Sequence, residues 1–73
     1  MQTVKKTYKV DRSSISYIRW IIESYDGMAI VSTVNPLEAV IELKIAPGCE
    51  ATINELIHSL RVDEGIKLIQ NDQ

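Results

Sequence analysis

The sequence predicts one α+β domain with the element order βαββαβ, a four-stranded antiparallel sheet carrying two helices on one face. Three observations support this prediction. The chain has 73 residues, of which 45% are hydrophobic and 25% charged, and this is the composition of a globular protein. Apolar residues recur with a period of two in some segments and with helical spacing in others. Turn-forming pairs separate these segments.

The first half of the chain predicts a strand followed by a helix. Residues 4–10 alternate apolar and polar side chains, as a half-buried strand does. Residues 11–14 are polar and are expected to supply N-capping oxygens to the helix. Asp26-Gly27 is expected to end that helix, because glycine adopts a left-handed conformation without steric cost. The apolar stripe of the helix comprises Ile15, Ile18, Ile21, Ile22 and Tyr25.

The middle of the chain predicts a hairpin of two strands. Residues 28–34 are rich in β-branched side chains, Asn35-Pro36 is a turn signal, and residues 37–46 alternate again. The pattern leaves open which side of the second strand faces the core. Its two possible inner sets are Met28, Ile30 and Val34, or Ala29, Val31 and Thr33.

The last third predicts a second helix and a short strand. Pro47-Gly48 interrupts the chain, the helix runs to about Arg61, and residues 66–70 form the final strand after a turn at 63–65. The apolar face of the helix comprises Cys49, Ile53, Leu56, Ile57 and Leu60. Right-handed crossovers then place the first and third strands at the centre of the sheet, which is the arrangement of the ferredoxin-like plait. Residues 1–73 are expected to form this single domain.

The junction between the first strand and the first helix resembles the opening of ACT domains, in which a strand ends in an Asp-Arg pair. The residues that carry the resemblance are Val10 to Ile15, then Ile18, Ile22 and the run from Gly27 to Val31. The resemblance implies an ACT-like regulatory module that binds a small ligand at this junction. ACT domains usually continue with Pro-Gly, and Ser13-Ser14 stands there in this chain.

A second resemblance concerns the strings at residues 23–27 and 33–36. Glu-Ser-Tyr-Asp-Gly followed by Thr-Val-Asn-Pro is similar to a small, uncharacterised bacterial domain family of unknown function. This resemblance implies a fold and supplies no activity.

Charge and hydrophobicity disfavour several partners. A net charge of −2 provides no field of one sign to attract nucleic acid or an anionic membrane. The plait surface that stacks bases in RNA-recognition domains would here present lysines, Thr7, Val40 and Glu42 without an aromatic ring. No segment approaches the length of a bilayer span, and the amino terminus has no secretion signal, so we expect a cytoplasmic protein.

Enzymatic activity is not expected, and neither is a metal or another cofactor. His58 lies off the apolar stripe of the second helix and has no ligand partner at suitable spacing. Cys49 begins that helix but also continues its apolar stripe, which favours a buried structural thiol over a reactive one. Glu38, Glu42 and Lys44 are expected to share a solvated sheet face with Lys5 and Lys9 of the neighbouring first strand, where opposite charges pair across the strands.

Trp20 is the residue that a purely structural interpretation explains least well. Helical geometry places it opposite the apolar stripe, with Tyr17 on the flank toward it. Aromatic side chains are enriched at the buried centres of protein interfaces, so Tyr17 and Trp20 are candidate interface residues. The alternative is that Trp20 lies along the protein's own surface beneath a loop or the amino-terminal segment.

Together these observations predict a non-catalytic, ACT-like module that acts as a homo-oligomer, most simply a homodimer. A small polar ligand is expected at the candidate ligand-binding residues Asp11, Arg12, Ser13 and Ser14, where side chains and first-turn N–H groups converge. The alternative is a structural or adaptor protein that recognises a protein partner through Tyr17 and Trp20.

Overall fold

The computed structural model describes residues 3–71, and its elements follow the predicted order. A short 3-10 turn precedes the first helix, and no helix within the described residues is long and apolar enough to cross a membrane. The elements are β1 (Val4–Val10), η1 (Arg12–Ser14), α1 (Ile15–Glu23), β2 (Ala29–Asn35), β3 (Val40–Ile45), α2 (Glu50–Val62) and β4 (Leu68–Gln70).

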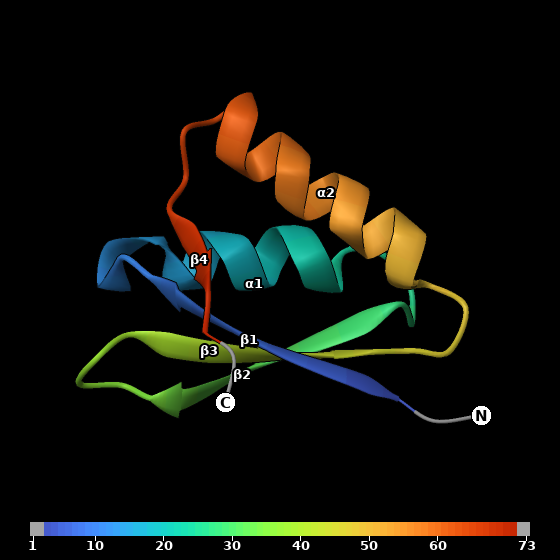
Figure 1. Ribbon diagram of the computed structural model, residues 1–73, viewed down its shortest axis with the longest axis horizontal. Coiled ribbons are helices and arrows are strands. Elements are labelled where there is room, and N and C mark those ends of the chain that lie inside the picture. Colours follow the sequence, from blue (N-terminus) through green and yellow to red (C-terminus); the bar gives the residue numbers. More distant parts are fainter. Residues whose placement is uncertain (1–2, 72–73) are drawn as a thin grey trace.

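The four strands form one antiparallel sheet in the order β2-β3-β1-β4. The first and third strands therefore lie at the centre, as the crossover rule predicts. Both helices lie on the same side of the sheet, and β4 descends from the end of α2 to pair with β1 (Figure 1). The α+β class, the antiparallel sheet and the two helices are thus confirmed.

The core lies between the inner face of the sheet and the two helices. Alternation on β3 directs Ile41, Leu43 and Ile45 inward, and each is fully buried. The helices contribute residues at helical spacing, so each buries one stripe against the sheet. The largest fully buried side chains are Ile18, Ile22, Ile41, Leu43, Ile45, Ile53 and Leu60.

The structure resolves which face of β2 is buried. Ala29 and Val31 are 6% and 4% exposed, whereas Ile30 is 60% exposed, so the side of β2 that carries Ala29 and Val31 faces the core. Thr33, the third member of that set, is exposed. Ala29 and Val31 therefore add no apolar area to the sheet face turned away from the helices. Register decides the question, because Val31 lies opposite the buried Leu43 and Ile30 opposite the exposed Lys44.

The predicted third strand begins too early, because β3 starts at Val40 and not at residue 37. The side-chain oxygen of Asn35 accepts hydrogen bonds from the N–H groups of Leu37 and Glu38, each at 3.1 Å, and holds these residues in a turn. Ala39 then adopts a left-handed φ of 56°, an uncommon conformation for a residue with a Cβ atom. Glu38 consequently lies in the turn and not on the strand.

Two further boundaries differ from the predicted ones. Tyr25 was expected on the apolar stripe of α1, but the helix ends at Glu23 and Tyr25 is 38% exposed in the following turn. Gly27 does adopt the expected left-handed conformation, with φ of 69°. The last strand begins at Leu68, since the N–H of Ile66 donates to the carbonyl of Leu60 at 3.0 Å and is held by the end of α2.

The register of the central strands does not provide the predicted cross-strand charge pairs. Lys5 lies directly opposite Lys44, and Thr7 lies opposite Glu42. Lys9 lies opposite Val40. Like charges directly across a sheet repel, so the Lys5–Lys44 pair opposes the pairing of β1 with β3.

We therefore predict that Lys5→Glu stabilises the protein by roughly 0.2–1 kcal/mol, because the change replaces repulsion across the sheet with attraction. Lys9→Glu is the control, since Lys9, like Lys5, lies two residues from the partner of Glu42 but faces Val40. Urea unfolding at low salt measures both variants, and added salt should reduce the difference between them. Equal stability of the two variants at low salt would contradict the prediction.

Candidate functional site

The outer face of α1 is the surface that stands out from the rest of the fold. Ile18 and Ile22 point into the core and are fully buried, which leaves the opposite side of the helix toward solvent. Side chains spaced by three or four positions line an open groove of about 350 Å³ on that side. The lining residues are Ser16, Arg19, Trp20, Glu23 and Ser24.

Trp20 is 68% exposed, and its indole ring lies beside the ring of Tyr17. The ring centroids are 6.3 Å apart and the ring planes are inclined by 42°, within the range of favourable aromatic pairs. The tilted pair presents a large apolar surface to solvent. Trp20 therefore does not lie buried beneath a loop.

Tyr17 is fixed by a contact with a distant part of the chain. Its hydroxyl donates a hydrogen bond of 2.5 Å to Oε1 of Glu64, in the turn after α2. This hydrogen bond raises the pKa of Tyr17, and burial and the negative charge of Glu64 act in the same direction. The hydrogen bond to Glu64 thus holds the Tyr17 ring in place next to the Trp20 ring.

Glu23 connects the groove to the edge of the sheet. Its Oε2 accepts a hydrogen bond of 3.0 Å from the N–H of Val31 on β2, the edge strand beside α1. A backbone donor that would otherwise be unpaired along this edge is thereby satisfied. The contact ties the face of α1 that carries the groove to the edge strand β2. The sequence carries no local signal for this contact, because the two partners belong to different elements.

The residues predicted to bind a small ligand lie together at the end of β1, but they do not cap a helix as expected. Neither Asp11 nor Ser14 forms a side-chain capping hydrogen bond. The backbone N–H of Ser14 donates instead to the carbonyl of Asp11 at 2.9 Å, which closes the 3-10 turn. The capping prediction is wrong because the chain tightens into this turn before α1 begins.

Arg12 makes a long-range contact from the same junction. Its Nη2 donates to the carbonyl of Leu37 at 3.1 Å and ties the junction to the β2–β3 turn. Asp11 and Ser13 are exposed, and Ser14 is half-buried. The ligand-binding role of these four residues stays a prediction.

The two residues considered for chemistry occupy unrelated positions. Cys49 precedes α2 and packs against the core, but it is half-buried and not fully buried as expected. His58 is exposed on α2. Among residues 3–71, no group of three or more His, Cys, Asp or Glu side chains is arranged to hold a metal ion.

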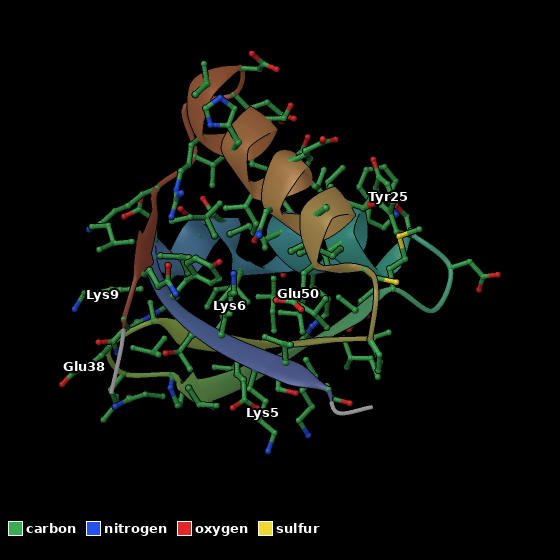
Figure 2. The ribbon with its side chains drawn as sticks, turned by 45° about the vertical axis from the view of Figure 1, so that its right-hand side comes forward. Lys5, Lys6, Lys9, Tyr25, Glu38 and Glu50 are labelled. Carbon is green, nitrogen blue, oxygen red and sulfur yellow. The ribbon has the colours of Figure 1, made fainter. Side chains whose placement is uncertain are left out.

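The sequence interpretation overlooked Lys6, which lies on the inner side of β1. Its ammonium group donates to Oδ1 of Asn54 on α2 at 3.1 Å. Lys5 points away from the helices and Lys6 toward them (Figure 2). Strict alternation along β1 was the signal that could have placed Lys6 on this side.

The contact between Tyr17 and Glu64 leads to a titration prediction. Because the folded-state pKa of Tyr17 is raised, the contact contributes stability that is fully present below pH 10.0 and is lost as the pH rises through the folded-state pKa. Glu64→Ala should move the titration of Tyr17 downward, toward 10.0. The ring-carbon NMR signal of Tyr17 measures this shift. Glu55→Ala is the control, and a Tyr17 titration unaltered by Glu64→Ala would contradict the assignment.

Comparison with known proteins identifies the chain's family by sequence. No curated protein and no solved structure shows significant similarity to the chain. Residues 8–63 match the family described as Domain of unknown function (DUF4911), from the second half of β1 through the end of α2. Since this match covers well over half of the 73 residues, the chain belongs to that family of domains of unknown function.

Proposed function

We propose that this domain is a non-catalytic module that acts through self-association, as a homodimer whose interface is the outer face of α1. The observation that carries the proposal is Trp20, which is 68% exposed beside an open groove and next to the fixed ring of Tyr17. Trp and Tyr are enriched among the central anchors of protein interfaces, which supports this proposal.

The charges of the groove favour a second copy as the occupant. Arg19 and Glu23 lie one turn apart on the same face of α1. In a twofold arrangement with antiparallel α1 helices, Arg19 of each copy faces Glu23 of the other. The same surface is therefore complementary to itself, as a symmetric dimer requires, while Trp20 supplies the apolar centre.

The size of the domain supports association as well. A chain of 73 residues buries only roughly 60% of the surface that its unfolded form exposes, so its stability is modest. Packing the outer face of α1 against a second copy would increase the buried apolar area beyond what one domain can bury alone. A homodimer is thus a physical means by which a small domain gains stability.

We further propose that the fold is an ACT-like, ferredoxin-like plait. The strand order β2-β3-β1-β4 and the placement of both helices on one face support this assignment. Because of the resemblance to ACT domains, we also propose that a small polar ligand binds at Asp11, Arg12, Ser13 and Ser14. The exposed carboxylate of Asp11 and hydroxyl of Ser13 are the groups that such a ligand would contact.

Trp20→Ala tests the proposed interface. Loss of a central Trp anchor should weaken dimerisation by about thirtyfold or more, while the fold is retained because Trp20 packs little against its own domain. Light scattering over a concentration series measures the molar mass. Leu37→Ala is the matched control, since it removes another exposed apolar side chain, 84% exposed, from the β2–β3 turn.

Three outcomes separate the alternatives. A concentration-dependent dimer that Trp20→Ala weakens and Leu37→Ala does not would support the proposal. A dimer unaffected by Trp20→Ala would place the interface elsewhere. A monomer at all concentrations would overturn self-association and favour the adaptor alternative, in which the same face binds a different protein.

A further inference from the structure

The sheet face turned away from the helices has a definite pattern of side chains. Pairing of the strands arranges this face, which we term the open face, in three rows across β2, β3 and β1, with β4 extending the last. Each outer row contains lysine and apolar side chains, the last row also contains an asparagine, and the middle row is polar. The rows are Ile30, Lys44 and Lys5; then Ser32, Glu42 and Thr7; then Asn35, Val40, Lys9 and Ile69.

The open face is positively charged in a protein that is negative overall. It carries three lysines and one glutamate, whereas the whole chain has a net charge of −2. All three lysines are exposed, and Glu42 is half-buried. The acidic excess of the chain therefore lies on other surfaces, and the open face attracts anionic groups.

The lysines are concentrated at the two ends of the open face. Lys5 and Lys44 lie directly opposite each other, roughly 5 Å apart at their Cα atoms. Lys9 lies four residues along β1, about 13 Å from Lys5. Glu42 occupies the middle row between these ends. Attraction for anions is thus strongest at two separated points, with a negative charge between them.

We propose that the open face binds an acidic segment of a partner protein that carries two carboxylates about 13 Å apart, each beside an apolar side chain. A carboxylate placed between Lys5 and Lys44 would relieve the repulsion of the two ammonium groups. The apolar neighbours would contact Ile30 at one end and Ile69 at the other, which are 60% and 55% exposed.

The pattern favours separated carboxylates over a continuous polyanion. A nucleic acid or an anionic lipid surface presents closely spaced negative charges, and some of these would lie over Glu42. The open face also lacks the aromatic rings on which bases stack. A protein segment can instead place small neutral residues over the middle row.

This inference does not depend on the proposed dimer. The open face and the outer face of α1 belong to different layers of the fold, so one can be altered without the other (Figure 1). Failure of acidic-segment binding would leave the dimer intact, and loss of the dimer through Trp20→Ala would leave the open face unchanged.

A designed peptide tests the proposal directly. The probe is a nine-residue synthetic peptide with two glutamates four positions apart, each next to an isoleucine, and with serine elsewhere. Titration into isotope-labelled protein should shift the amide NMR signals of Lys5, Lys9 and Lys44. Binding should weaken as salt is added, because the attraction is electrostatic and exposed.

Matched variants locate the binding surface. Lys5→Gln and Lys44→Gln should each weaken binding by about three- to fivefold, the effect of one exposed charge pair. Lys6→Gln is the control, because Lys6 lies on the same strand as Lys5 but on the helix side of the sheet. Equal weakening by Lys5→Gln and Lys6→Gln would overturn the proposal.

Two competing probes complete the test. A peptide with its two glutamates adjacent should bind more weakly than the probe, because it cannot reach both ends of the open face. Equal binding of this peptide, or tighter binding of a single-stranded oligonucleotide or an anionic vesicle to the open face, would overturn the proposal. Absence of shifts at Lys5, Lys9 and Lys44 would do the same.

Discussion

Burial of one face of β3 against both helices is the constraint on which the rest of the structure depends. Ile41, Leu43 and Ile45 alternate along this strand, and all three are fully buried. Because β3 is central, its register with β1 and β2 fixes which side chains of those strands point inward. The same alternation sends Glu42 and Lys44 to the opposite side. The alternation of apolar and polar side chains along β3 thus determines which residues form the core and which side chains lie on the outer face of the sheet.

Much of the fold could be predicted because apolar periodicity and turn residues agree along most of the chain. The element order, the left-handed Gly27 and the exposure of Trp20 all follow from local patterns. The inner side of β2 could not be predicted, since both of its faces are apolar and only the register with β3 distinguishes them. The start of β3 was missed because the side chain of Asn35 organises a turn among residues that look like a strand.

The candidate site was predictable only in part, for the same physical reason. Helical geometry identified Trp20 and Tyr17, because exposure on a helix follows from angular position alone. Contacts between different elements could not be predicted from the sequence pattern. These are the hydrogen bonds of Glu23 with Val31 and of Tyr17 with Glu64. The contact with Glu64 holds the Tyr17 ring in place beside Trp20, and the contact with Val31 holds Glu23 against β2. The molecule consequently has two outer surfaces of different chemistry, an aromatic one on the helix layer and a basic one on the sheet.

The hydrogen bond from Val31 to Glu23 also affects how readily a strand from another molecule could add to the sheet. β2 is a seven-residue strand at the edge of the sheet, long enough to template the addition of strands from other molecules. A carboxylate anchored on α1 occupies a backbone donor near the middle of that edge. An incoming strand would have to displace Glu23 before it could form a continuous ladder. A single side chain in the helix layer therefore opposes the addition of a further strand at this edge of the sheet.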